Sequence, residues 1–391
     1  MLLNLSAAFA QLNTFYVTPI STNAGYVAAQ DSHLVALNPA VTSNNLLLVF
    51  IDGSGSKTKD YTFFPKLAAS LGYHVVSVAY PNSPTIGSVC AASADSMCYD
   101  NYRQEVCYGT PVSSSIAVDS LNSIHNRLVN LLTYLSTTYP SDGWGQFVTT
   151  NDVNWSSVVT SGHSQGSGHA LYFAKTKAIH RVIMFAGVDD YSVRFNKPPH
   201  WVYSPSVTPP QNIYSFLHLQ DDVEPYPHEY ESLKAIGLVN GVDDSTIVDN
   251  KTTPYNNSHC LYTNVTPPHA GIASAYHDAP VVDYFTSVNG TQLLYNPVWT
   301  YMLTTAQTTG IAEALTNAEE LTVYPNPASS EISWSLPSLL PADVEVFSLQ
   351  GASVEKVKGQ THMDISALPA GVYLLTISQG NGVFHSRLIK N

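Results

Sequence analysis

The chain has 391 residues, of which 44% are hydrophobic and only 12% charged, and its formal net charge at neutral pH is −13. This length suggests two domains, because a single hydrophobic core rarely extends beyond about 250 to 300 residues. The negative charge argues against nucleic acid or an anionic membrane surface as a partner, since a protein that binds either needs a basic patch. No apolar run approaches the length needed to span a membrane.

The N-terminus, MLLNLSAAFAQ, combines an apolar run with the small-x-small sequence Ala8-Phe9-Ala10. This pattern predicts a signal peptide over residues 1–10, with cleavage before Gln11. A basic segment ahead of the apolar run is missing, and a buried N-terminal strand is the alternative.

Predicted strands and helices alternate from about residue 45 to 305. Continuous apolar runs and β-branched stretches predict strands over 46–51, 74–80, 181–187, 213–220 and 260–265. Helical spacing of apolar residues predicts helices over 61–73, 115–139 and 297–306, and 156–178 predicts a strand, a tight turn and a helix. Such alternation indicates an α/β domain over residues 11–307, with a mainly parallel central sheet covered on both faces.

The pattern changes after about residue 310, where short strands and turns follow one another without a long helix. Residues 343–357 predict two strands around Gly351, and 373–391 predict a hairpin around Gly380-Asn381-Gly382. We therefore expect a small all-β sandwich domain over 321–391, joined by a linker over 308–320.

The stretch SGHSQGSGHA (161–170) places Ser164 between Gly162 and Gly166. A predicted strand precedes it and a predicted helix follows, which is the setting of the G-x-S-x-G nucleophile elbow. The N-terminus of that helix offers backbone N–H groups to an anionic intermediate. The alternative is an ordinary glycine-rich turn.

A serine nucleophile needs a base, and the base needs an acid that orients it. At an elbow serine the chain order is Ser, acid, His. Asp221 is the preferred acid, because it follows the strand 213–220 and Val223 is expected to turn back into the core. Asp222 is the alternative, and Asp189 and Asp190, after the preceding strand, are the fallback. A carboxylate that caps a turn is the non-catalytic reading of each.

The base is expected between the last strand and the closing helix. We prefer His277 in AYHDAPVVDY, and His269 is the alternative. His259 lies at the wrong end of its strand, and His163 is adjacent to the nucleophile and is not expected to be the base. Any single histidine is more often structural than catalytic.

An oxyanion hole requires two backbone N–H donors. One is expected from Gln165, directly after the nucleophile. The other is expected from Ser54 in the loop DGSGSK, whose glycines let the backbone approach a substrate. A plain turn between strand and helix is the alternative for this loop.

The four cysteines are Cys90, Cys98, Cys107 and Cys260. An even number in an exported chain favours disulfides. Cys90 and Cys98 lie in one polar loop and are expected to pair, which leaves Cys107 with Cys260 as a second pair; buried free thiols are the alternative. No spacing of histidine and cysteine suggests zinc, and no nucleotide or flavin motif appears, so no metal or cofactor is expected.

Residues 45–305 resemble the α/β-hydrolases, near the lipase and esterase branches, in VFIDGSGS, VVSVAYPN, SGHSQGSGHA and NPVWTYML. These motifs are similar to those of a little-characterised family of secreted bacterial hydrolase-like proteins. In that family the loop after YPN has two cysteines and an R-x-E segment, matched here by Cys90, Cys98, Arg103 and Glu105. The resemblance implies a serine hydrolase mechanism and leaves the substrate open.

The tail resembles the C-terminal sorting domain of the type IX (Por) secretion system. The matching segments are VYPNPA (323–328), VFSLQGASV (346–354), DISALPAGVYLLTI (364–377) and the terminal RLIKN. The resemblance implies a secreted or cell-surface protein, exported through Sec and then type IX secretion, whose tail is recognised by that machinery and often removed. A carbohydrate-binding β-sandwich is the alternative.

The sequence therefore favours a secreted carboxylic-ester hydrolase with the triad Ser164, His277 and Asp221 and an acyl-enzyme intermediate. A peptidase or amidase on the same scaffold is the enzymatic alternative. A surface binding protein without turnover is the alternative from another class. The ester could be polymeric, since the chain is exported and holds 24 tyrosines, and we expect a monomer.

Overall fold

The computed structural model describes residues 12–26, 31–239, 245–305, 322–335, 342–348, 353–379 and 382–391. The chain separates into two compact units, residues 1–308 and 309–391. The predicted signal peptide (1–10) and linker (308–320) fall outside the described residues. Within those residues no helix has the length and apolar character that a membrane crossing requires.

The larger unit is organised around one mixed sheet, which within the described residues has nine strands in the order β1-β2-β4-β3-β5-β6-β7-β9-β8. The strands are β1 (Asn13–Val17), β2 (His33–Leu37), β3 (Leu47–Ile51), β4 (His74–Val78), β5 (Val158–His163), β6 (Arg181–Phe185), β7 (Ile213–His218), β8 (Ser245–Ile247) and β9 (Cys260–Thr263). From β4 across to β8 all neighbours are parallel, whereas β2 runs antiparallel to β1 and β4. The prediction of an α/β domain with a mainly parallel sheet is confirmed.

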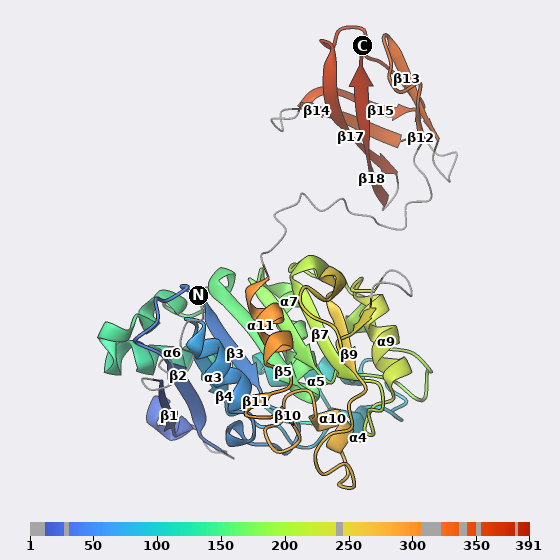
Figure 1. The fold of residues 1–391 in the computed structure, drawn as a ribbon. Coiled ribbons are helices and arrows are strands. Elements are labelled where there is room, and N and C mark those ends of the chain that lie inside the picture. Colours follow the sequence, from blue (N-terminus) through green and yellow to red (C-terminus); the bar gives the residue numbers. More distant parts are fainter. Residues whose placement is uncertain are drawn as a thin grey trace. The chain divides into compact units, whose positions relative to one another are not determined.

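Helices cover both faces of this sheet (Figure 1). Leu48 and Phe50 of β3 pack with α3 (Phe63–Ser70) and α11 (Asn296–Thr304) on one face. Val49 and Ile51 of the same strand belong to the core on the other face. The helices of that second face are α5 (Cys98–Tyr108), α6 (Ile124–Thr138) and α7 (Gln165–Thr176). The strand is a continuous apolar run because both of its faces are buried.

Shorter elements complete the larger unit. They are α2 (Pro19–Thr22), α4 (Ile86–Cys90), α8 (His200–Tyr203), α9 (Tyr226–Ala235), α10 (Ala275–Asp278), β10 (Val288–Asn289) and β11 (Gln292–Leu293). Most of them lie in the loops that follow the parallel strands, where the candidate site is found.

The helix expected over 115–139 begins later than predicted, at Ile124. Ser123 caps it, because the Ser123 hydroxyl accepts a hydrogen bond from the N–H of Asn126. The preceding segment is held as a loop by the buried Glu105 carboxylate. That carboxylate accepts hydrogen bonds from the N–H groups of residues 112, 113 and 118 at 2.9, 2.7 and 3.0 Å. A distant carboxylate thus overrides the local helical spacing.

The predicted disulfide between Cys90 and Cys98 is confirmed. It joins the end of α4 to the start of α5, with a Cα–Cα distance of 5.4 Å. The predicted second pair is wrong, because Cys107 and Cys260 form no disulfide. Cys107 lies in α5 with its Sγ 3.4 Å from His169 Nδ1, whereas Cys260 is in β9, between β7 and β8. The two thiols are buried in different parts of the core.

The smaller unit is an all-β structure whose described strands pair antiparallel, and one isolated parallel bridge joins residues 328 and 390. One sheet contains β12 (Thr322–Tyr324), β13 (Glu331–Ser335) and β16 (His362–Asp364), and the other contains β14 (Ala342–Ser348), β15 (Ser353–Gln360), β17 (Gly371–Gln379) and β18 (Gly382–Lys390). Ile332, Val344 and Leu375 are fully buried between them. The expected small all-β domain is confirmed.

The disulfide assignment leads to a first prediction. Iodoacetamide applied to the unfolded, unreduced protein should label Cys107 and Cys260 alone, and labelling after reduction should reach all four cysteines. Four labelled cysteines before reduction would contradict the bond between Cys90 and Cys98. An absence of label before reduction would contradict the assignment of Cys107 and Cys260 as thiols. Mass spectrometry of the peptides gives the answer.

The same bond should contribute to stability. The double variant Cys90→Ala/Cys98→Ala should lose about 2 to 3 kcal/mol of unfolding free energy, because the closed loop is short. Denaturant titration measures this loss. The wild-type protein in reductant is the matched control and should give the same midpoint as the variant.

Candidate active site

Ser164 lies at a sharp turn between β5 and α7. Its backbone angles are φ 53° and ψ −128°, in a region that residues with a side chain rarely adopt. Such a conformation costs on the order of 1–3 kcal/mol and persists only where the surroundings enforce it. Here the Ser164 N–H donates to the carbonyl of Phe185 at the end of β6, at 2.9 Å. The turn therefore holds Ser164 at the carboxyl end of the parallel strands.

Glycine is required on both sides of this serine by close backbone approach. A Cβ atom on Gly162 would lie 2.3 Å from the carbonyl oxygen of Gly166. A Cβ atom on Gly166 would lie 2.1 Å from the carbonyl oxygen of Ile51 in β3. Any larger residue would separate the strand, the turn and the neighbouring strand, so the spacing G-x-S-x-G reflects packing of the elbow.

Asp221 and His277 are joined by a short hydrogen bond. The Asp221 Oδ2 atom lies 2.6 Å from His277 Nδ1, and the two side chains are 0% and 4% exposed. Asp221 follows β7, and its Oδ1 accepts the N–H groups of Val223 and Glu224, both at 2.8 Å. Because the chain wraps around this carboxylate, Val223 is 53% exposed, and its expected return to the core is wrong.

The protonation of His277 depends on two opposing effects. Burial lowers the pKa of His277, but the charge and hydrogen bond of Asp221 outweigh burial and raise the pKa to about 9. Its Nε2 atom is buried and has no hydrogen-bond partner among the described residues. This nitrogen is therefore available to exchange a proton with a reacting group.

The Ser164 hydroxyl donates to Asp189 Oδ2 at 3.3 Å. No hydrogen bond between Ser164 and His277 is present in the described part of the chain. The two segments are nevertheless in contact, because the ring of His163, the residue before Ser164, is centred 4.9 Å from the ring of His277. Catalytic hydrogen bonds are often long before substrate binds, and a rotation of the serine hydroxyl is a small change. Asp189 was predicted only as a fallback acid, and the structure places it beside Ser164.

Asp190 has a different partner. It forms a two-point ion pair with the fully buried Arg103, at 3.0 and 2.5 Å, and accepts the indole N–H of Trp201 at 2.8 Å. Arg103 Nη1 also donates to the carbonyl oxygen of Gln165 at 2.5 Å. A Cβ atom on Gly168 would lie 2.2 Å from Arg103 Nη2, so this glycine admits the guanidinium. Sequence reasoning identified Arg103 only through a family resemblance and missed its contact with the elbow.

The loop after β3 lies directly against the elbow. A Cβ atom on Gly53 would be 3.3 Å from Ser164 Cβ, and the Ser54 hydroxyl donates to Gln165 Oε1 at 2.8 Å. Gln165 is the first residue of α7, so its N–H has no acceptor within the helix. The two expected oxyanion donors, the N–H groups of Ser54 and Gln165, therefore lie on segments that flank Ser164.

The alternative residues occupy other positions. Asp222 Oδ1 accepts the backbone N–H of His277 at 3.1 Å, and so positions the histidine without touching its ring. The ring of His269 stacks on Tyr284 with centroids 4.2 Å apart. His259 Nδ1 is bonded to the carbonyl oxygen of Ile213, at the opposite end of β7. Neither histidine contacts Asp221 in the described structure.

One group of side chains could in principle hold a metal ion. Its three candidate ligand atoms, one each from His163, His277 and Asp278, all lie within 4.8 Å of one another. Their contacts have another explanation. His163 is bonded through Nε2 to the carbonyl oxygen of His277 at 3.2 Å and through Nδ1 to the hydroxyl of Tyr61 at 3.0 Å. Burial, and then the charge of His277, lower the pKa of His163 well below its usual value. We assign no metal to this group.

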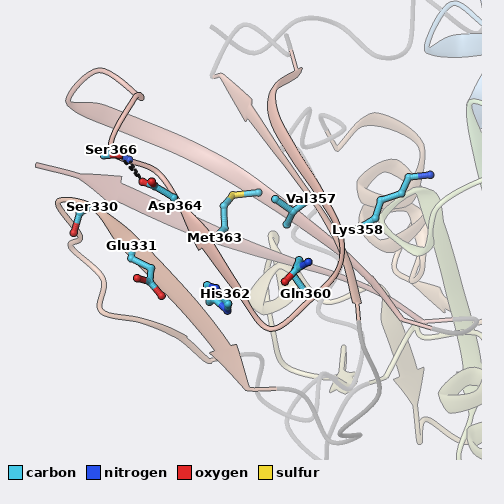
Figure 2. Close-up of a pocket in the computed structure, with 9 residues that line it drawn as sticks. All are labelled: Ser330, Glu331, Val357, Lys358, Gln360, His362, Met363, Asp364 and Ser366. Carbon is cyan, nitrogen blue, oxygen red and sulfur yellow. Dashed lines mark hydrogen bonds between the residues drawn. The ribbon is translucent and has the colours of Figure 1, made fainter.

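A hollow of about 520 Å³ lies in the smaller unit (Figure 2). In this hollow the Asp364 carboxylate accepts hydrogen bonds from the hydroxyl and the backbone N–H of Ser366. Polar side chains form most of its wall, which consists of Ser330, Glu331, Val357, Lys358, Gln360, His362, Met363, Asp364 and Ser366. It has no arrangement of nucleophile, base and acid, and we place the candidate site in the larger unit.

Comparison with known proteins identifies the smaller unit. Residues 322–391 match the secretion system C-terminal sorting domain. No curated protein matches the chain. The protein is therefore secreted or presented at the cell surface through the type IX secretion system, whose machinery recognises this tail.

The pKa of His277 provides a second prediction. A ¹⁵N NMR titration of the histidine side chains should show His277 titrating near pH 9. The pKa should fall by at least about one unit in Asp221→Asn, because the charge that raises it is removed. Asp222→Asn is the control, since Asp222 contacts only the backbone N–H, and it should leave the pKa nearly unchanged.

The same shift predicts how stability depends on pH. Because the folded-state pKa exceeds the unfolded value of 6.5, the stabilisation is fully present below pH 6.5. It should be lost as the pH rises through about 9. Unfolding titrations of wild type and His277→Gln between pH 6 and 10 measure this loss. A constant difference between the two proteins over that range would contradict the assignment.

Proposed function

We propose that the protein is a secreted serine hydrolase that cleaves carboxylic esters, with Ser164 as nucleophile, His277 as base and Asp221 as the orienting acid. The observation that supports this most directly is the buried hydrogen bond between Asp221 and His277 beside a strained serine. The histidine keeps one ring nitrogen without a partner in the described structure. A serine hydroxyl needs such a base to become nucleophilic at neutral pH.

The topology supports the same reading. Ser164 follows β5, Asp221 follows β7 and His277 comes in the segment after β9. These three strands are parallel members of one sheet, with β6 between β5 and β7. This is the chain order and placement of the triad in α/β-hydrolases. Fold likeness alone does not determine a reaction, and the proposal depends on the side chains.

Because its pKa is near 9, His277 must first lose its Nε2 proton. The proposed reaction then begins when the Ser164 hydroxyl leaves Asp189 and donates to the neutral His277 Nε2. Ser164 Oγ attacks the acyl carbon while His277 takes its proton, and Asp221 stabilises the imidazolium that results. His277 then protonates the departing alcohol, which leaves an acyl-enzyme. Water, activated by the same nitrogen, attacks this ester and releases the acid.

Charge on the carbonyl oxygen develops at the tetrahedral stage. The N–H groups of Ser54 and Gln165 are the proposed donors to that oxygen. Asn82 fixes the Ser54 loop, because its amide donates to the carbonyl oxygens of Gly53 and Ser56 at 3.0 and 2.9 Å. Arg103, held to the Gln165 carbonyl, fixes the first turn of the helix. Donors that are already in place need no reorganisation during the reaction.

A p-nitrophenyl ester series, from acetate to long acyl chains, tests the proposal. Ser164→Ala should reduce kcat by about 10⁴-fold or more, and Asp221→Asn by about 10⁴-fold, with little change in KM. Ser141→Ala is the matched control, because Ser141 is an exposed serine in the short helical turn Pro140–Asp142. This variant should keep wild-type activity.

Activity that survives in Ser164→Ala would exclude this serine as the nucleophile. A folded wild-type protein that hydrolyses no ester of the series would contradict the esterase assignment. Amide substrates would then be tested on the same variants.

A further inference from the structure

Asp189 is a carboxylate beside the nucleophile that the proposed reaction does not use. Its Oδ2 accepts the Ser164 hydroxyl at 3.3 Å, and its side chain is only 11% exposed. Its Oδ1 is buried and has no hydrogen-bond partner among the described residues. The nearest cation, Arg103, is 3.6 Å from Oδ1 and is already bonded to Asp190 and to the carbonyl of Gln165. Asp189 therefore shares Arg103 with Asp190, which makes the shorter contact at 2.5 Å.

A second carboxyl group in the same region is also without a partner. Glu229, in α9, is fully buried, and neither of its carboxyl oxygens has a hydrogen-bond partner in the described structure. Burial, and then the charges of Asp221, Asp189 and Glu224, raise its pKa well above the usual range. Glu229 therefore lies near the carboxyl groups of Asp189, Asp221 and Glu224.

Glu224 completes this acidic surrounding. Burial, and then the neighbouring charges of Asp189 and Asp221, raise its pKa to about 8. Its single close partner is His228, at 2.6 Å. Burial and Asp190 likewise raise the pKa of Asp189 to about 6, against the opposite effect of Arg103. At pH 7 Asp189 is thus mainly ionised, whereas the raised pKa values keep Glu224 and Glu229 mainly protonated.

A carboxylate that only shares its cation opposes the reaction at this position. The tetrahedral intermediate places a negative oxygen on the carbon attached to Ser164 Oγ, within a few ångströms of Asp189. Like charges at such a distance in a buried site repel strongly. A positive group on the substrate would remove this repulsion and would also satisfy the free Oδ1 atom.

Covalent geometry limits where that positive group can be. In an amino acid the α-nitrogen lies about 2.5 Å from the carbonyl carbon, as follows from standard bond lengths and angles. When Ser164 is bonded to that carbon, an α-ammonium group lies close to Ser164 Oγ and within hydrogen-bond reach of Asp189. A positive group further along an acyl chain would pass beyond this carboxylate.

We propose that Asp189 binds a protonated amino group on the carbon next to the scissile carbonyl, so that the substrates are esters of amino acids whose α-amino group is free. This inference rests on the proposed ester hydrolysis and specifies its acyl group. Asp189 acts as a specificity-determining residue, because it contacts the substrate and takes no part in proton transfer.

Three ethyl esters with the same three-carbon acyl backbone test the proposal in the full-length protein at pH 7, and titration of the released acid follows the reaction. They are alanine ethyl ester, N-acetylalanine ethyl ester and ethyl propionate. Each kcat/KM is divided by the rate constant of alkaline hydrolysis, which removes intrinsic reactivity. The wild-type protein should favour alanine ethyl ester over each of the other two by about 30-fold or more, as expected for a desolvated charge pair.

Substitutions of Asp189 then locate the effect. In Asp189→Asn the normalised kcat/KM values for the three esters should become about equal. Asp189→Glu should restore part of the preference for the free amino group. Asp95→Asn removes an exposed carboxylate elsewhere and should keep the wild-type preference. A preference that persists in Asp189→Asn would overturn the proposal.

The wild-type comparison decides the matter even if Asp189→Asn does not fold, because equal normalised rates on the free and acetylated esters would exclude recognition of the amino group.

Failure of the proposed function gives a different result, since the wild-type protein would then hydrolyse none of the three esters. In that case binding of alaninamide and propionamide to Ser164→Ala, measured by calorimetry, tests Asp189 alone. Equal affinity for the two amides would overturn its role.

Discussion

The candidate site depends on one buried cation. Arg103 reaches from α5 to the carbonyl of Gln165 at the start of α7 and to Asp190 after β6, and all three groups are fully buried. Bringing a guanidinium out of water is costly unless it is paired and fully bonded, and removal of one partner of such a pair typically costs about 3 to 5 kcal/mol. The pair therefore ties the helix after the disulfide to the elbow and to the loop that contains Asp189.

The same constraint explains the charge distribution around Ser164. Because Arg103 is occupied by Asp190 and by a carbonyl group, the neighbouring carboxyl groups are left to other partners. Asp221 is paired with His277, and Glu224 with His228. Asp189 meets Arg103 only at 3.6 Å, and Glu229 has no hydrogen-bond partner in the described structure. A buried carboxylate that shares its cation, as Asp189 does, is suited to a substrate that supplies positive charge, which is the basis of the proposed selectivity.

Two adjacent histidines show how environment separates chemical roles. His163 and His277 have ring centres 4.9 Å apart, and both are buried. The pKa of His163 is lowered by burial and by its neighbour, whereas Asp221 raises that of His277. Neighbouring groups whose pKa values are shifted in opposite directions are typical of sites that move protons. Here one ring is a neutral support and the other is the proposed base.

Export and covalent structure are consistent with each other. The sorting domain directs the chain out of the cell, where disulfides form and persist. The bond between Cys90 and Cys98 fastens the segment that leads into α5, and so it restrains the helix that holds Arg103. The thiols of Cys107 and Cys260 are protected by burial in the core.

The sequence by itself determined the features that depend on local patterns or on chain order. These are the alternation of strands and helices, the glycine–serine elbow, the bridge between nearby cysteines and the sorting tail. Chain order also singled out Asp221 and His277, which the structure joins by a hydrogen bond. Only the tertiary structure decided which distant groups meet, because a pattern of apolar residues does not specify pairings across the sheet. It placed Asp189 against Ser164, brought Arg103 to Asp190, and kept Cys107 from Cys260. It also held 115–123 out of a helix through Glu105, since a buried charge must find its hydrogen bonds wherever the fold provides them.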